Sequence, residues 1–259
     1  MNETVRGTAA QAGDHPMLET GARLGYAASG LIHLLVAWLA LQIAWGGSSG
    51  SSDQTGAMTQ LAKSPVGSAL LWVVVAGFVL LALWQVAEAV ARGDTGSRVK
   101  SAGKAVLYLA LAWTGVSVLR GTSSSGAGQT ESFTASLMAQ PFGRVLVAVV
   151  GIGVLAVGAY HVVKGWKAKF LRDLRENPGT WLVRAGRVGY VAKGVALGIV
   201  GALFVAAAVT ADPDRAAGLD GALRSLQGVP FGQALLTAVA LGLAAYGVYS
   251  FGRARYARV

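Results

Sequence analysis

The 259-residue sequence contains no cysteine, and charged residues make up only 13% of it. The absence of cysteine excludes disulfide bonds, thiolate catalysis and cysteine-based metal sites. Soluble domains carry about 25% charged residues, so the low charge, together with 54% hydrophobic residues, indicates a membrane protein. Residues 1–22 hold no apolar stretch, so we expect no cleavable signal peptide and infer that the first membrane span directs insertion.

Six apolar stretches are long enough to cross a bilayer, whose hydrocarbon core of about 30 Å requires roughly 20 apolar residues. They lie near residues 24–45, 66–90, 103–120, 143–165, 188–210 and 231–252. The predicted fold class is therefore all-α, a polytopic membrane protein with six transmembrane helices. The Ser- and Gly-rich segments at 46–52 and 122–140 are predicted to be external loops.

The net charge of +10 is distributed unevenly along the chain. Of the 22 lysines and arginines, 17 lie before the first stretch, after the last, or in the second and fourth connections together with the stretch ends that border them. Positive residues collect on the cytoplasmic side of membrane proteins, so we expect a bacterial cell-membrane protein with both termini in the cytoplasm. Its basic side is expected to attract anionic lipids, and nucleic acid is not an expected partner.

One pattern occurs three times in the chain. Pro65, Pro141 and Pro230 each begin a Pro-Val-Gly or Pro-Phe-Gly element, with an aromatic residue 19 positions later and a charged residue 23 positions later. Parallel copies of a two-helix unit are related by an axis along the membrane normal, which predicts a closed bundle with approximate three-fold symmetry. The predicted organisation is a mobile cytoplasmic N-terminus at 1–20, repeats at 21–92, 98–170 and 184–256, and a basic cytoplasmic linker at 171–183.

The residues that carry this pattern resemble a known family. Each copy has an odd-numbered helix with small residues at its entry, then Pro-[Phe/Val]-Gly, then an even-numbered helix that closes on aromatic-polar-x-x-charged. Over residues 21–256 the chain resembles the domain-of-unknown-function 1206 family of integral membrane proteins, found largely in actinobacteria. The resemblance implies a six-helix membrane protein and no particular activity, so it supplies no catalytic residue.

His33 is the main candidate for chemistry inside the membrane, because it lies near the middle of the first stretch. Ionisable groups at that depth are costly and are candidates for function. The alternatives are a neutral histidine bonded to a neighbouring helix, a group that handles protons or a solute, and a haem or metal ligand. We expect no cofactor and no metal. The candidate intramembrane polar site comprises His33, Tyr108, Gln85, His161 and Ser250.

A second candidate site is a cluster of charges at the cytoplasmic boundary. Three of its members lie 23 residues after the prolines of the repeats, and two lysines are predicted to begin odd-numbered helices at the same level. The set contains one acid and four bases: Glu88, Lys104, Lys164, Lys193 and Arg253. The alternatives are an interfacial ion-pair network with snorkelling lysines and a mouth that attracts anions or anionic lipid headgroups.

Small residues and tryptophans have simpler interpretations. The glycine pairs Gly21/Gly25 and Gly194/Gly198, and the glycines between 151 and 158, favour close helix packing, with the lining of a narrow pore as the alternative. Most tryptophans lie near predicted span ends, as in an interfacial belt.

For function, the sequence favours the passage or binding of a small solute or ion within the helical bundle. The alternative is a non-catalytic scaffold or partner subunit whose basic cytoplasmic face binds anionic lipid or a protein. A membrane redox or lipid-modifying enzyme is disfavoured by the few ionisable residues within the spans, and oligomer formation is left open.

Overall fold

The computed structural model describes residues 16–46, 51–91, 95–176 and 178–257, and its named elements are all helices. Six of them are long and apolar enough to cross a membrane, which confirms the predicted fold class. Three begin eight residues before the predicted apolar stretch, at Pro16, Thr95 and Thr180. The six are α2 (Pro16–Ala44), α4 (Pro65–Ala91), α5 (Thr95–Leu119), α7 (Gly143–Trp166), α8 (Thr180–Thr210) and α10 (Gly232–Tyr256). Most of the N-terminal segment predicted to be mobile, and residues 47–50 of the first predicted loop, lie outside the described residues.

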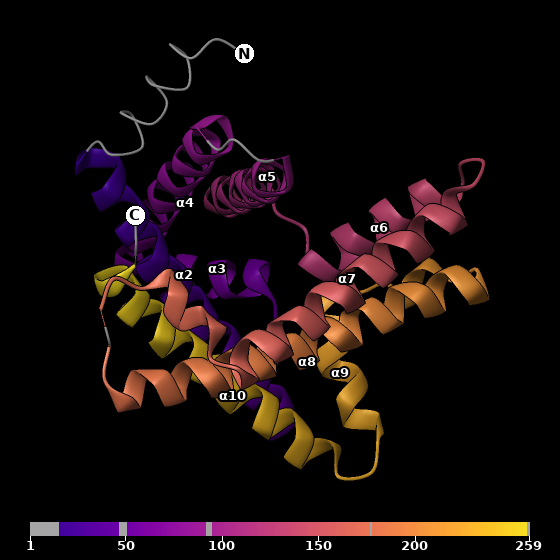
Figure 1. Cartoon of the computed structure of the whole chain (residues 1–259). Coiled ribbons are helices and arrows are strands. Elements are labelled where there is room, and N and C mark those ends of the chain that lie inside the picture. Colours follow the sequence, from indigo (N-terminus) through magenta and orange to yellow (C-terminus); the bar gives the residue numbers. More distant parts are fainter. Residues whose placement is uncertain (1–15, 47–50, 92–94, 177, 258–259) are drawn as a thin grey trace.

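Successive membrane helices run in opposite directions, so their ends form two opposite sides of the molecule. We call the side where α2 begins and α10 ends the basal side, and the opposite side the cap side. The Arg23 side chain near the start of α2 donates a hydrogen bond of 2.8 Å to the carbonyl of Arg255 near the end of α10. The chain therefore enters and leaves the described bundle at neighbouring points (Figure 1).

The most extensive helix contacts join successive repeats. The second helix of each repeat packs against the first helix of the next, in the pairs α4–α5, α7–α8 and α10–α2. This cyclic pairing is what a three-fold arrangement of repeats predicts. The expected closed bundle is nevertheless wrong: the α10–α2 pair packs on both α4 and α8, whereas α5 and α7 make no extensive contact (Figure 1). Lipid tails are as apolar as these helix surfaces, so no hydrophobic force closes the remaining side.

Glycines set the distance between α7 and α8. A Cβ atom at Gly158 would lie 2.8 Å from the carbonyl oxygen of Gly194 and 2.9 Å from the backbone nitrogen of Gly198. A Cβ at Gly201 would lie 2.8 Å from the Gly151 carbonyl oxygen. The two backbones therefore touch along the seam, which confirms the helix-packing interpretation for Gly151, Gly158 and Gly194. It was wrong for Gly153, because nothing lies within 4 Å of a Cβ atom placed there.

The glycine of each Pro-x-Gly element has a steric role. A Cβ atom at Gly67, Gly143 or Gly232 would overlap the carbonyl oxygen of a leucine six residues earlier, at Leu61, Leu137 and Leu226 respectively. Only glycine lets the short preceding helix turn so closely into the membrane helix. In the second and third repeats the residue before this glycine, Phe142 or Phe231, has a positive φ of 61° or 59°.

The predicted external loop at 122–140 contains the helix α6, so that assignment was wrong, whereas the described residues of the loop predicted at 46–52 form no helix. Each repeat carries a short helix on the cap side: α3 (Gln54–Ala62), α6 (Gly126–Met138) and α9 (Gly218–Ser225). The side chains of Asp53 and Ser125 accept hydrogen bonds from Gly56 N and Gly128 N, and so cap the first two of them. Side-chain capping stabilises a helix that its Gly- and Ser-rich sequence does not predict. Three short 3₁₀ segments complete the chain: η1 (Lys169–Asp173), η2 (Pro213–Arg215) and η3 (Leu226–Gly228).

Candidate functional site

The central contact of the basal half joins α2 and α8. Lys193 Nζ lies 3.3 Å from His33 Nε2, and His33 Nδ1 lies 2.7 Å from the carbonyl oxygen of Ser29. A carbonyl can only accept, so Nδ1 carries the proton of a neutral ring and Nε2 accepts from the lysine. His33 is therefore oriented by its own helix and bonded to a neighbouring one, halfway along its membrane span.

The sequence analysis predicted that Lys104 and Lys193 begin their helices, and this prediction was wrong. Lys193 lies 13 residues after the start of α8, about 20 Å along the axis, and Lys104 lies nine residues after the start of α5. Both helices begin with polar turns that precede the apolar stretch, and a prediction based on apolar length does not detect such turns. Lys193 thus reaches the middle of the bundle, whereas Lys104 is exposed on α5.

Tyrosines surround the lysine. Lys193 Nζ lies 4.2 Å from the ring centroid of Tyr246, within the range of a cation–π contact. The Tyr190 ring is 5.2 Å from that of Tyr246 and 5.4 Å from that of Tyr249. Phe170, on η1, stacks against Tyr190 at 5.3 Å and closes this aromatic group on the basal side. Aromatic faces stabilise a cation partly removed from water.

Arg253 lies nearer the basal end of the same region. Its guanidinium lies 4.2 Å from the ring centroid of Tyr26, and its Nη2 donates to the Tyr26 hydroxyl at 3.3 Å. Its Nε is buried and has no hydrogen-bond partner in the described part of the chain, and the same holds for the hydroxyl of Tyr249, one turn earlier on α10. A buried donor without an acceptor costs about 1–3 kcal/mol. A hydrogen-bond acceptor from outside the described chain that reached Arg253 Nε or the Tyr249 hydroxyl would therefore be stabilising.

Lys164, unlike Lys193 and Arg253, has an acidic partner. Its Nζ lies 2.6 Å from the Asp173 carboxylate of η1 and 5.2 Å from the Tyr190 ring centroid. His161, one turn earlier on α7, places its ring 5.8 Å from that of Tyr190. We call this assembly the basal cluster: Tyr26, His33, His161, Lys164, Phe170, Asp173, Tyr190, Lys193, Tyr246, Tyr249 and Arg253.

The basal cluster joins members of both predicted sites. It takes His33 and His161 from the intramembrane set and three of the five predicted charges. Ser250 is buried beside it and donates to the Tyr246 carbonyl oxygen at 2.9 Å. The others lie outside the cluster: Gln85 is buried on α4, Glu88 is half-buried on α4, and Tyr108 stacks on Phe78 at 6.1 Å between α4 and α5. Glu88 and Tyr108 are nevertheless within electrostatic range of Tyr26.

Sequence reasoning missed the aromatic part of the cluster and its acid. Tyr26 and Tyr190 each follow a glycine and are 164 residues apart, the same separation as Ser29 and Lys193, so repeat register could have identified them. Asp173 was assigned to the basic linker, because only the fold of η1 brings it back to α7.

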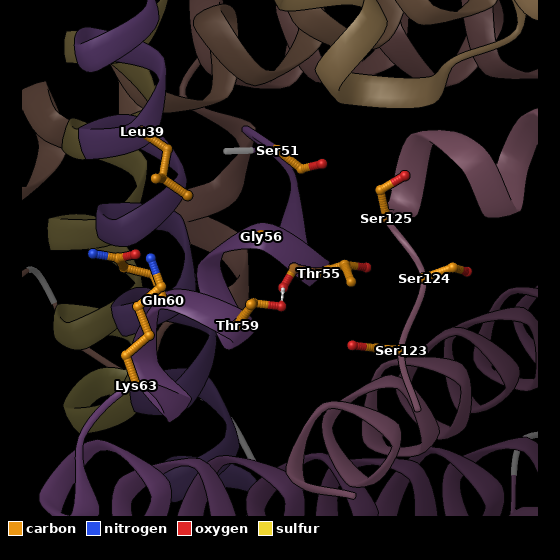
Figure 2. Close-up of a pocket in the computed structure, with 10 residues that line it drawn as sticks. All are labelled: Leu39, Ser51, Thr55, Gly56, Thr59, Gln60, Lys63, Ser123, Ser124 and Ser125. Atoms are coloured by element: carbon orange, nitrogen blue, oxygen red, sulfur yellow. Dashed lines mark hydrogen bonds between the residues drawn. The ribbon is translucent and has the colours of Figure 1, made fainter. Parts of the chain in front are cut away.

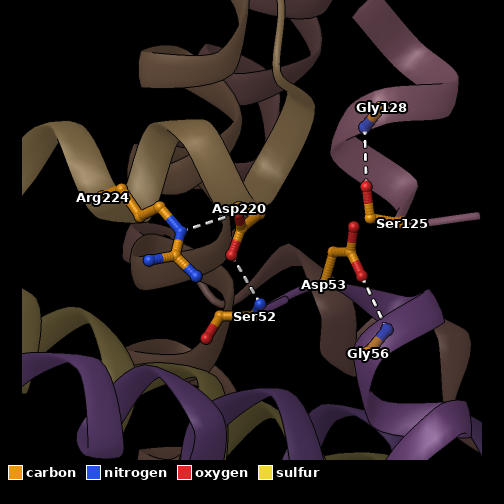
Figure 3. A network of polar contacts seen from close by, with 7 residues as sticks. All are labelled: Ser52, Asp53, Gly56, Ser125, Gly128, Asp220 and Arg224. Carbon is orange, nitrogen blue, oxygen red and sulfur yellow. Dashed lines mark hydrogen bonds and ion pairs between the residues drawn. The ribbon is translucent and has the colours of Figure 1, made fainter. Parts of the chain in front are cut away.

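The cap side carries a second polar network. The Asp220 carboxylate of α9 accepts from the backbone nitrogen of Ser52 at 2.6 Å and from Arg224 Nε at 2.8 Å (Figure 3). Beside it, Asp53 caps α3 through Gly56 N at 2.8 Å. Burial is the main cause that raises the pKa of Asp53 above its usual 3.8; Asp220 raises it further, and the Gly56 bond opposes the shift. These contacts join the first and third repeats.

A polar pocket of about 250 Å³ opens between α3 and the segment before α6. Its lining includes the hydroxyls of Thr55 and Thr59 on one side and of Ser123 and Ser125 on the other, with Lys63 at its edge (Figure 2). This pocket is separate from the predicted intramembrane polar site, because its lining includes none of His33, Gln85, His161 and Ser250. Within the described ranges, no group of three His, Asp or Glu residues could hold a metal ion.

Comparison with known proteins gives a family without an assigned activity. A model of the family described as Domain of Unknown Function (DUF1206) matches three times, at residues 24–92, 99–168 and 188–257. The uncharacterized protein YxxB of Bacillus subtilis (strain 168) is 30% identical over 254 residues, which cover 93% of this chain and 92% of that protein. No solved structure matches the chain. The three matches confirm the predicted repeats and the family resemblance, and the Bacillus relative shows that such chains are not confined to actinobacteria.

Proposed function

The chain belongs to the family described as Domain of Unknown Function (DUF1206), and we propose that it binds a small anionic solute in the basal cluster and passes it into the helical bundle. One observation carries this proposal. Arg253 and Lys193 lie partly buried between helices, and neither forms an ion pair with a described residue. An anion would provide the missing partner for both.

The electrostatics of the basal cluster support an anion rather than a cation. Lys164, Lys193 and Arg253 share a single acid within the cluster, Asp173, which is bonded to Lys164. A charge removed from water without a partner is strongly destabilising, and rings of tyrosine offset only part of that cost. Guanidinium and hydroxyl groups are also the donors that carboxylate and phosphate oxygens accept from.

The two unpaired cations suggest two binding stations. Lys193 contacts the ring of Tyr246 on α10. Arg253 lies seven positions after Tyr246 on the same helix, about 10 Å along the axis. The outer station is Arg253 with Tyr26 and the Tyr249 hydroxyl, and the inner one is Lys193 with His33. Binding has more direct support than passage, because the buried Arg253 Nε and Tyr249 hydroxyl without partners among the described residues concern binding alone.

We place the basal side in the cytoplasm and the chain in the bacterial plasma membrane. Exposed lysines and arginines gather on the basal side, at Lys167, Lys169, Arg184 and Arg187, and positive residues are retained in the cytoplasm during insertion. The outer station would then face the cytoplasmic pool of anionic metabolites and phosphate.

A thermal-shift experiment on the detergent-purified protein tests the binding claim. A ligand present at one hundred times its Kd stabilises the folded state by about 2.7 kcal/mol, so inorganic phosphate or acetate should raise Tm by several degrees. The Arg253→Gln variant should lose this anion-dependent shift, because it removes the unsatisfied donor of the outer station.

Arg255→Gln is the matched control, since Arg255 is two residues away on α10 and exposed. It should keep the full anion-dependent shift. Equal responses of the two variants, or no response of the wild type to any small anion up to high concentration, would refute the proposal.

The alternative function is a membrane scaffold whose basal face binds anionic lipid. The exposed basic residues of η1 and α8 favour it, because each basic residue near an anionic surface contributes about 1 kcal/mol. Salt-sensitive binding to anionic vesicles that persists in Arg253→Gln, with no response to soluble anions, would select this alternative.

A further inference from the structure

A groove on the lipid-facing surface between α8 and α10 is not used by the basal cluster. It has a volume of about 660 Å³ and is lined mainly by Val188, Val191 and Val195 of α8 and by Ala238 and Val239 of α10. Val188 and Val195 are 54% and 43% exposed, so the groove opens toward the membrane. Its volume lies within the range of about 300–1,000 Å³ typical of ligand sites.

The basal end of this groove is cationic. Arg187 lines both the groove and a neighbouring pocket of about 290 Å³ that contains Arg184 and Thr180. Neither arginine forms an ion pair with any residue that the structure describes, and both are exposed. Trp166 lines the same groove and is 77% exposed, as is typical of the boundary between lipid and water.

The order of these groups along α8 matches the parts of a phospholipid. From Arg187 to Val195 the groove runs eight residues, about 12 Å, from the charged end toward the middle of the bilayer. We propose that the groove binds one acyl chain of an anionic phospholipid, whose phosphate is held by Arg187 and Arg184. Guanidinium groups match the geometry of phosphate oxygens and can bind them in a bidentate manner.

An anionic lipid fits better than the other occupants of such a surface. An apolar helix of a second copy would cover the valines but would leave both arginines without an ion-pair partner. A zwitterionic lipid brings its own cation to the same place, so two unpaired arginines favour a headgroup with net negative charge. This site is separate from the basal cluster, and its test does not depend on Arg253 or Lys193.

Native mass spectrometry of the detergent-purified full chain tests the proposal. Phosphatidylglycerol and phosphatidylcholine with identical acyl chains are titrated separately, and the affinity for the first bound lipid is measured. The wild type should prefer phosphatidylglycerol by roughly tenfold or more. The Arg184→Gln/Arg187→Gln variant should lose this preference, and Ala238→Phe, which fills the groove, should weaken the first binding event for both lipids.

Two matched controls separate the site from general effects. Lys167→Gln/Lys169→Gln removes the same charge from exposed positions on the same side, and Ala156→Phe adds the same side chain to an exposed position on α7. Both should bind phosphatidylglycerol as the wild type does.

Three outcomes would overturn the site. They are a wild type without headgroup preference, an arginine variant that loses no more affinity than the lysine control, and a dimer that Ala238→Phe dissociates while lipid binding is unchanged. The last would assign the groove to a second copy. None of them would alter the anion-dependent shift that Arg253 is proposed to control, so the two proposals fail separately.

Discussion

On the cap side, Asp220 is bonded to both Arg224 and the backbone of Ser52, whereas on the basal side Arg253 and Lys193 meet tyrosine and histidine side chains. Both regions join the first and third repeats, and both are partly removed from water. In the cap network the buried acid has two partners, which is the arrangement that holds a fold together. In the basal cluster only Lys164 is paired with an acid, Asp173, and neither Lys193 nor Arg253 forms an ion pair with a described residue, which is the difference that the proposed anion site would explain.

The largest expected effect comes from breaking the cap network. Asp220→Ala leaves Arg224 Nε and the buried Ser52 nitrogen without their acceptor, so we expect a loss of about 2–3 kcal/mol of folding free energy. Unfolding in detergent, followed by circular dichroism, measures it. Asp212→Ala, which breaks an exposed pair with Arg215, should cost less than about 0.5 kcal/mol. Similar losses in the two variants would show that the cap network is no more structural than the surface pair.

The second effect tests how much the close packing of α7 against α8, rather than charge, contributes to the stability of the basal cluster. Gly158→Ala pushes α8, which carries Tyr190 and Lys193, away from α7, at a cost of about 1–3 kcal/mol. Gly153→Ala is the matched control, since nothing lies within 4 Å of its added methyl group; it should gain about 0.5–1 kcal/mol from helix propensity. The same unfolding assay applies, and a Gly158→Ala variant as stable as the Gly153→Ala variant would contradict the close seam.

The third effect has the opposite sign. Lys193→Met removes a partly buried cation whose desolvation costs several kcal/mol. It also loses a cation–π contact with Tyr246 that contributes about 2 kcal/mol and the hydrogen bond to His33 Nε2, worth about 1 kcal/mol. Without added anion, we therefore expect this variant to be more stable than the wild type by about 1–2 kcal/mol. Lys167→Met, at an exposed position, should change stability by less than about 0.5 kcal/mol. Destabilisation by Lys193→Met would mean that the lysine is structural, like Asp220.

The smallest effect is a pH dependence of the cap side. The pKa of Asp53 is raised by burial above 3.8, so the folded state binds this proton more tightly than the unfolded state does. Stability from this group is fully present below pH 3.8 and is lost as pH rises through the raised value. Asp53→Asn keeps a capping side chain and should gain stability relative to the wild type at neutral pH but not below pH 3.8. Unfolding at both pH values measures the difference, and Asp214→Asn, at an exposed position, should show none.

The sequence was sufficient to predict the six membrane helices and the three repeats, because those signals are local or repeated, but it did not predict how the helices pack into an open arrangement. Apolar length identifies each membrane helix, and the register of Pro65, Pro141 and Pro230 identifies the repeats. The starts of α2, α5 and α8 were missed because their first turns contain polar residues. The helices α3 and α6 were missed because capping by Asp53 and Ser125 outweighs weak helix propensity.

The site was harder to predict because it depends on which helices touch. Lys193 and His33 lie in different repeats at non-equivalent positions, so neither spacing nor hydropathy brings them together. In the sequence, Tyr190 and Tyr246 cannot be distinguished from ordinary interfacial aromatic residues, because only the packing of α8 against α10 brings their rings together. Only the packing of the third repeat against the first converts separate polar residues into one cluster.

The most direct measurement of the central claim is an anomalous difference map from crystals grown with selenate, a phosphate-like anion with a strong anomalous signal. The account predicts a peak within hydrogen-bonding distance of Arg253 and the Tyr249 hydroxyl, with a second, weaker peak beside Lys193. Peaks confined to exposed basic residues such as Lys167, with none at either station, would contradict it.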